Sequence, residues 1–188
     1  MRICVFCGSS PGNLQSYRDA AVEVGEVLAH ENIELVYGGG NVGLMGIVAD
    51  AALAAGGNVT GVMPRHLVES EIGHKGLTTL EVVEDMHERK MKMSELSNAF
   101  IALPGGAGTL EEITEQWTWA QLGIHAKPCA FYNVDGYYNP LRAMIGQIVD
   151  AGFMKASYAD MLIYREDAQA ILEAFRTYEA PPRKWIKE

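Results

Sequence analysis

The chain has 188 residues, of which 48% are hydrophobic and 21% are charged, a balance typical of a soluble globular domain. Its formal net charge of −9 argues against nonspecific binding to nucleic acid or to an anionic membrane, because both need a basic face. The sequence lacks the ~18 consecutive apolar residues of a membrane-spanning helix, and its apolar N-terminal run is too short for a signal peptide.

Apolar, strand-like runs alternate with helix-like stretches along the chain. The predicted strands are Ile3–Phe6, Ile33–Tyr37, Val59–Val62, Leu80–Val83, Phe100–Leu103, Cys129–Tyr132 and Met161–Tyr164. The predicted helices are approximately Tyr17–Glu31, Leu44–Ala55, Met86–Ser97, Leu110–Leu122, Asn139–Ala151 and Asp167–Tyr178. This alternation is typical of a Rossmann-like α/β fold, a doubly wound and mainly parallel sheet with helices on both faces. We expect one domain over residues 1–180, followed by a C-terminal tail at 181–188.

Helix ends and cysteines add local detail. Ser16 is a plausible N-cap of the first helix, Asp167 lies near the start of the last, and Gly56 and Gly57 should end the second. Cys4 and Cys7 form a C-x-x-C within a predicted strand, where positions three apart point to opposite faces. A shared metal or redox disulfide is therefore disfavoured, and we expect reduced thiols in a cytoplasmic protein.

Three of the predicted strands end in glycine-rich loops, at residues 7–12, 37–46 and 104–108. The carboxyl ends of parallel strands meet at one edge of a sheet, and ligands bind outside that edge. We therefore expect the three loops to line a ligand cleft. The candidate ligand contacts in the first two loops are Gly8, Ser9, Gly39, Gly40, Gly43 and Met45.

The second loop matches G-x-G-x-x-G over residues 38–43, which by itself is a weak signal. A dinucleotide site also needs an acidic residue at the tip of the next strand, and that strand ends at Val62-Met-Pro-Arg65. NAD binding is therefore disfavoured, although Arg65 leaves NADP open. We favour a nucleotide or phosphate contact over a simple packing turn.

The third loop joins a buried apolar run, 98–103, directly to a helix. Glycines let the backbone approach a phosphate, and the free N–H groups of a first helical turn point at it. Thr109, Glu111 and Glu112 open the predicted helix, and carboxylates are unexpected beside a phosphate. The alternative interpretation is a T-x-x-E capping box, in which Thr109 caps the helix and Glu112 reaches back to the N-cap amide.

Arg89 and Lys90 belong to a charged segment at the start of the helix after the fourth strand. The helix macrodipole disfavours cations there, so the pair indicates an anion shared with the helix terminus; the alternative is a solvated charged face. The five histidines have no metal-ligand spacing, and we expect no metal site. Residues that could suggest a cofactor box are better explained as core or subunit interface: Met86, Met91, Met93, Trp117 and Trp119.

Segments 86–90 (M-H-E-R-K) and 104–112 (P-G-G-A-G-T-L-E-E) together resemble the LOG family, the cytokinin riboside 5′-monophosphate phosphoribohydrolases, whose members were long labelled lysine decarboxylases. The resemblance covers nearly the whole chain and includes segments 7–10, 37–46 and 118–125, together with 133–139. It implies a Rossmann-like fold, a homodimer or larger homo-oligomer, and no cofactor. Nothing in the sequence supports pyridoxal chemistry.

The resemblance implies hydrolysis of the N-glycosidic bond of a purine nucleoside 5′-monophosphate, which yields the free base and ribose 5-phosphate. It implies Arg89 and Glu112 as the catalytic pair. The substrate-contacting positions that it implies, with Gly105 added from the third glycine-rich loop, are Glu71, Lys90, Gly105, Gly106, Ala107, Gly108, Thr109, Leu110, Glu111 and Thr118.

This chemistry agrees with the residues themselves. Cleavage of a ribosyl–base bond develops positive charge on the sugar, which a carboxylate stabilises while it orients or deprotonates the attacking water. A non-catalytic nucleotide sensor or carrier on the same fold is the main alternative, since fold does not decide function. An NADP-dependent enzyme is a third. The preferred base, the size of the oligomer, the separate roles of Arg89 and Lys90, and any role in cytokinin production stay open.

Overall fold

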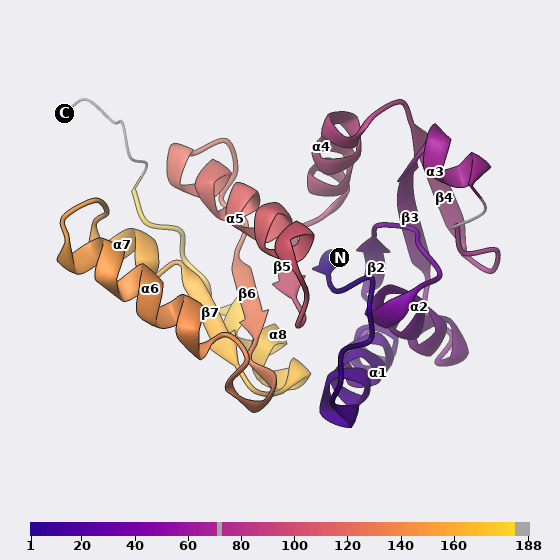
Figure 1. Cartoon of the computed structure of the whole chain (residues 1–188), viewed down its shortest axis with the longest axis horizontal. Coiled ribbons are helices and arrows are strands. Elements are labelled where there is room, and N and C mark those ends of the chain that lie inside the picture. The colour runs from indigo at the N-terminus through magenta and orange to yellow at the C-terminus, as the bar shows by residue number, and fades with distance from the viewer. Residues whose placement is uncertain (71–72, 183–188) are drawn as a thin grey trace.

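Short apolar segments form one sheet in the computed structural model of the protein, which describes residues 1–70 and 73–182 (Figure 1). The strands are β1 (Arg2–Phe6), β2 (Glu34–Tyr37), β3 (Val59–Pro64), β4 (Thr79–Val83), β5 (Ala99–Ala102), β6 (Cys129–Tyr132) and β7 (Leu162–Arg165). Every residue of β3, β5 and β6 is buried, because helices cover both faces of the sheet. This double burial is why these strands are continuous apolar runs rather than alternating ones.

All neighbouring strands in the sheet are parallel, in the order β4-β3-β2-β1-β5-β6-β7. The predicted doubly wound sheet is confirmed, and within the described residues it is entirely parallel. The chain winds outward from β1 to β4 and then crosses back to place β5 on the other side of β1. The direction of winding therefore changes between β1 and β5, and crevices at such switch points are where this class of fold binds ligands.

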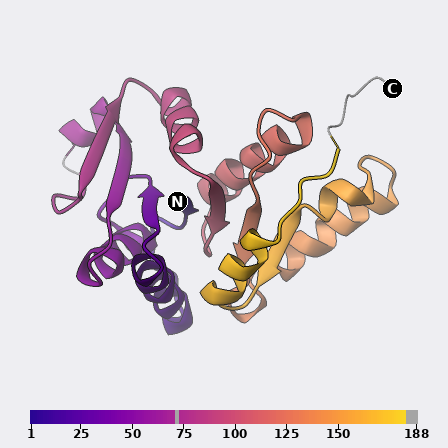
Figure 2. The same cartoon turned by 180° about the vertical axis from the view of Figure 1, so that it is seen from behind.

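The helices are divided between the two faces of the sheet (Figures 1 and 2). One face packs against α1, α2 and α8, and the other packs against α4, α5, α6 and α7, while α3 lies beside β3 and β4. The bounds are α1 (Gln15–His30), α2 (Gly43–Ala54), α3 (Arg65–Glu69), α4 (Met86–Leu96), α5 (Ala107–Leu122), η1 (Val134–Gly136), α6 (Asn139–Asp150), α7 (Ala156–Ala159) and α8 (Ala168–Arg176). The short elements α3, α7 and η1 were not predicted, because three to five residues are too few to show a periodicity.

The structure tests the predicted helix ends separately. Asp167 is confirmed as an N-cap, since its Oδ1 accepts a hydrogen bond of 2.7 Å from the Ala170 amide. Gly56 follows α2 with a φ of +81°, the left-handed conformation expected of a glycine that ends a helix. The prediction for Ser16 was wrong. α1 begins at Gln15, and the Ser16 hydroxyl donates instead to the Asp135 carboxylate at 2.5 Å.

The two cysteines of the C-x-x-C lie on opposite faces of β1 and its extension, as predicted. Cys4 is in the core beneath α4 and α5, whereas Cys7 is in the core beneath α1 and α2, and both thiols are free. No helix among the described residues has the length and apolarity needed to cross a bilayer. Most of the predicted tail, residues 183–188, lies outside the described part of the chain.

Candidate active site

Helix α5 begins three residues earlier than predicted, and this changes the meaning of the glycine loop before it. Gly106 is the N-cap and Ala107 the first helical residue, so Thr109 is already inside the first turn and is 3% exposed. The capping-box interpretation was therefore wrong: Thr109 is not the N-cap, and no side chain caps the helix. Glu111 and Glu112 fall in the second turn, which removes the conflict between carboxylates and a phosphate at the helix start.

Glycine occurs in this loop for two different structural reasons. A Cβ on Gly105 would lie 2.1 Å from the Thr109 hydroxyl oxygen, so the fold itself requires glycine there. A Cβ on Gly106 or on Gly108 would meet no atom within 4 Å. These two positions face open space, and the absent side chains leave the N–H groups of the first helical turn accessible to an anion.

Arg89 is held in a buried position between three elements. Its Nε donates to the Val62 carbonyl oxygen of β3 at 3.0 Å, and its Nη1 donates to Glu112 Oε1 of α5 at 2.8 Å. The guanidinium also lies against Gly38 at the end of β2, where a Cβ would be only 2.0 Å from Nη2. The first glycine of the second loop therefore makes room for Arg89.

Glu112 is an acid in an unusual environment. Its side chain is 14% exposed and its pKa is raised above the ordinary glutamate value, because burial outweighs the opposite effect of the Arg89 guanidinium. Neighbouring Glu111 raises the pKa further. A partly desolvated carboxylate with a raised pKa is the kind of group that enzymes use for proton transfer.

Lys90 makes a second connection between α4 and α5. Its Nζ donates to the carboxylates of Glu111 and Glu115, the latter at 3.0 Å, and the contact with Glu111 raises the pKa of Lys90. The start of α4 is capped by Asp85, which accepts from two backbone amides of the first turn. Asp85 thus occupies this helix terminus, and carboxylates of α5 pair with Arg89 and Lys90; the anion shared with the terminus stays a prediction.

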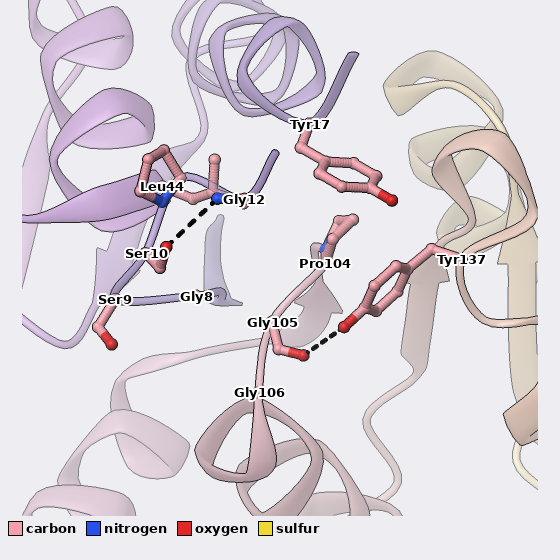
Figure 3. A pocket seen from close by; sticks show the side chains of 11 residues that line it. Gly8, Ser9, Ser10, Gly12, Tyr17, Leu44, Pro104, Gly105, Gly106 and Tyr137 are labelled. Carbon is pink, nitrogen blue, oxygen red and sulfur yellow. Dashed lines mark hydrogen bonds between the residues drawn. The ribbon is translucent and has the colours of Figure 1, made fainter. Parts of the chain in front are cut away.

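A pocket of about 280 Å³ opens at the switch point between β1 and β5 (Figure 3). Backbone of the first and third glycine-rich loops forms its floor, and two aromatic rings stand on one side. The lining residues are Gly8, Ser9, Ser10, Pro11, Gly12, Tyr17, Leu44, Pro104, Gly105, Gly106 and Tyr137. The two loops are joined by a hydrogen bond of 3.1 Å from the Gly8 amide to the Pro104 carbonyl oxygen.

The second glycine-rich loop packs on its neighbours. A Cβ on Gly43 would lie 2.3 Å from the carbonyl carbon of Ser9, so Gly43 allows the loop to touch the first one. Gly39 has a φ of +79°, and Gly40 forms an isolated bridge with Gly73. These contacts agree with the packing alternative, and ligand contact by Gly39, Gly40 and Gly43 stays a prediction.

Comparison with known proteins identifies the family. The family model described as "Possible lysine decarboxylase" matches residues 45–175. Cytokinin riboside 5′-monophosphate phosphoribohydrolase LOG1 of Arabidopsis thaliana is 48% identical over 177 residues, which cover 94% of this chain and 83% of that protein. The chain belongs to the LOG family. The probable LOG enzyme LOGL2 of Oryza sativa subsp. japonica is 46% identical over 187 residues, 100% of this chain and 77% of that one.

Solved structures with lower identity share the LOG-family fold. The molybdenum cofactor carrier protein of Chlamydomonas reinhardtii has a TM-score of 0.71 at 22% identity and covers 93% of this chain and 95% of its own. A molybdenum cofactor binding protein of Rippkaea orientalis has a TM-score of 0.70 at 20% identity, with 94% and 95% coverage. At these identities the likeness shows the fold alone.

The structure brings the residues that resemble LOG-family motifs into two groups. Gly8, Ser9, Gly105 and Gly106 line the pocket. The second group, which lies between α4 and α5 and does not line that pocket, consists of Arg89, Lys90, Glu111 and Glu112.

The remaining predicted positions are more scattered. Leu110 packs against the core, Ala107 is exposed, and Met45 packs beside Gly38. Thr118 is exposed, and its hydroxyl donates to the Thr114 carbonyl oxygen one turn back. Glu71 lies outside the described residues.

Two tyrosines that line the pocket were not among the site residues predicted from the sequence. Tyr17 and Tyr137 come from segments 120 residues apart, and their rings pack edge to face with centroids 5.7 Å apart. Tyr137 belongs to segment 133–139, which carried part of the LOG-family resemblance but had no assigned role. The resemblance of this segment to the LOG family was the feature of the sequence that could have pointed to Tyr137.

Proposed function

We propose that this protein hydrolyses the N-glycosidic bond of purine nucleoside 5′-monophosphates, including cytokinin riboside 5′-monophosphates, to the free base and ribose 5-phosphate. The relatives at 46–48% identity are named as phosphoribohydrolases of cytokinin riboside 5′-monophosphates, which supports this proposal. The observation that carries the proposal is the Arg89–Glu112 pair, in which the largely buried Glu112 carboxylate accepts a hydrogen bond of 2.8 Å from Arg89 Nη1. Glu112 lies about one and a half turns along α5 from the N-terminus of that helix, which is uncapped and open.

The phosphate is assigned to the start of α5. The amides of the first turn lack helical partners and no side chain caps them, while Gly106 and Gly108 leave the approach open. Because the chain carries a net charge of −9, this local geometry rather than the overall field must hold the anion. Arg89 and Lys90 provide positive charge nearby.

Glu112 is assigned to the reaction itself. Positive charge grows on the ribose ring as the bond from C1′ to the base breaks, and a carboxylate in a low-dielectric setting stabilises that charge. The same carboxylate can accept a proton from the water whose oxygen bonds to C1′, while the departing base takes a proton from the solvent, so that one water molecule is added across the bond. Arg89 holds Glu112 in place and, by lowering its pKa against the effect of burial, keeps it available as a base.

The test is a product assay with matched variants. Purified protein incubated with AMP, and separately with N6-isopentenyladenosine 5′-monophosphate, should release free base and ribose 5-phosphate. Glu112→Gln should reduce turnover by at least ~10²-fold while nucleotide binding persists, because the amide keeps the shape but cannot accept the proton. Glu115→Gln, which touches Lys90 from the same helix, is the matched control and should retain most activity.

The alternative of a non-catalytic nucleotide carrier gives a different result. Such a protein would bind AMP and leave it intact, and Glu112→Gln would change stability only. Absence of base release from every purine monophosphate tested, with binding retained, would replace the proposed function by this one.

We also propose that the protein is a homodimer or larger homo-oligomer and acts in the cytoplasm. Large apolar side chains stand on its surface, among them Phe153 at 84% and Ile124 at 63% exposure, and self-association would cover them. The cysteines Cys4, Cys7 and Cys129 are free thiols, as expected in a reducing compartment. Light scattering after size-exclusion chromatography measures the molar mass of the assembly, and a monomer at all concentrations would contradict the proposed homo-oligomer.

A further inference from the structure

We propose that Tyr137 is a positioning residue that locks the peptide between Gly105 and Gly106 in the orientation needed to receive the 5′-phosphate. The Tyr137 hydroxyl donates a hydrogen bond of 2.7 Å to the Gly105 carbonyl oxygen across the pocket (Figure 3). The inference rests on the proposed function and extends it to a residue from the distant β6–α6 connection.

Three successive carbonyl oxygens at the end of β5 and in the glycine loop each accept a hydrogen bond, two from adjacent tyrosines of the β6–α6 connection and one from the first glycine-rich loop. Leu103 accepts from the Tyr138 hydroxyl at 2.6 Å, Pro104 from the Gly8 amide at 3.1 Å, and Gly105 from Tyr137. The first two bonds hold the end of β5 within the core. The third acts on the peptide that leads directly into the N-cap of α5, so it acts on the proposed phosphate site rather than on the strand.

The geometry of a trans peptide explains why this bond matters. The carbonyl C=O and the following N–H point in opposite directions, so a Gly105 oxygen turned toward Tyr137 directs the Gly106 N–H away from it. Because the glycines on both sides carry no Cβ, the backbone itself sets little preference between the two orientations. Reversal would present a carbonyl oxygen to the anion in place of a donor.

Tyr137 is itself well placed to impose one orientation. Its ring packs edge to face against Tyr17 and against Tyr138, with centroids 5.7 and 5.0 Å away. The preceding turn is closed by Asn133, whose side chain bonds to Asn139 at 2.9 Å and accepts from the Tyr138 amide at 2.7 Å. Gly136 completes the turn with a φ of +73°. The N-V-D-G-Y-Y-N segment therefore presents the hydroxyl from a defined support.

The test compares three conservative variants, each of which removes one hydroxyl. Tyr137→Phe should raise the KM for AMP and the inhibition constant of ribose 5-phosphate together, by about three- to tenfold, with kcat nearly unchanged. Tyr164→Phe is the matched control: Tyr164 does not line this pocket, its ring stacks on Phe131 and its hydroxyl makes no hydrogen bond within the described residues, so both constants should stay at wild-type values. Tyr138→Phe removes a buried bond to Leu103 and should lower Tm with little change in KM.

Each outcome decides a separate question. Unchanged constants in Tyr137→Phe, or a loss of Tm and kcat without a change in KM, would overturn the role of Tyr137 while leaving the hydrolysis intact. Calorimetric titration with ribose 5-phosphate is independent of turnover. If the wild type binds it in a Tyr137-dependent way but releases no base, the proposed function fails and the positioning role stands. If the wild type neither binds ribose 5-phosphate nor hydrolyses AMP, both the proposed function and the positioning role of Tyr137 are contradicted.

Discussion

Arg89 and Glu112 come from α4 and α5, the helices that precede and follow β5 in the chain, and their side chains meet in a hydrogen bond of 2.8 Å although 23 positions separate them. Both side chains are largely buried, with exposed fractions of 11% and 14%. The partnership depends on Gly38, which leaves space for the guanidinium, and on the Val62 carbonyl oxygen, which orients it. Four segments of the chain thus combine to hold one carboxylate.

Because both side chains are largely buried, Arg89 and Glu112 should contribute to the free energy of unfolding in a strongly coupled way. Glu112→Leu leaves the Arg89 charge without its carboxylate partner and should lower the free energy of unfolding by about 3 kcal/mol, the lower end for breaking a buried pair. The double variant Arg89→Met/Glu112→Leu should lose less than the sum of the two single changes. Urea unfolding of all four proteins measures the coupling, and strict additivity would show that the pair does not interact energetically.

The raised pKa of Glu112 predicts the acid limb of the pH profile. The ionised carboxylate is the active form, so kcat/KM should fall as pH decreases through a midpoint above the ordinary glutamate pKa. Glu111→Gln removes a negative neighbour that raises this pKa, and the limb should therefore move to lower pH. Glu115→Gln should leave it in place. A shift of the limb to higher pH in Glu111→Gln would contradict the assignment.

Gly38→Ala should separate activity from stability. The new Cβ would overlap Arg89 Nη2, which lies at the end of a flexible side chain, so the guanidinium should move away from Glu112 while the fold survives. We expect at least a tenfold loss of kcat/KM, about 1.4 kcal/mol of transition-state stabilisation, with a smaller loss of unfolding free energy. Gly146→Ala in α6, where a Cβ meets nothing within 4 Å, is the matched control and should change neither quantity adversely.

Alanine at the open glycines at the start of α5 should weaken substrate binding without destabilising the fold. Gly106→Ala and Gly108→Ala introduce no clash and should leave Tm unchanged or slightly higher. Each methyl group projects into the space assigned to the phosphate, so the KM for AMP should rise severalfold. Gly105→Ala, whose Cβ meets Thr109, should instead lower Tm. Equal KM values in all three variants and the wild type would place the phosphate elsewhere.

Much of the architecture was predictable because it depends on local patterns. Strands buried on both faces must be apolar throughout, so runs such as Cys129–Tyr132 mark a parallel sheet before its order is known. Parallel strands also end at one edge, which is why the glycine loops after β1 and β5 could be expected to meet there, as the Gly8–Pro104 hydrogen bond shows. Arg89 and Glu112 were named together on family resemblance.

The sequence by itself therefore determined the fold class, the edge of the sheet that carries the site, and the residue types available for catalysis. Only the tertiary structure decided which of these side chains are paired and how deeply they are buried. Helix α5 starts at Ala107, which places Thr109 against Gly105, and the partners of Arg89 and Lys90 depend on α4 and α5 lying on the same face of the sheet. Periodicity and capping rules describe neighbours within one helix, whereas the contacts of Arg89 and Lys90 join two helices that the order of the strands brings together.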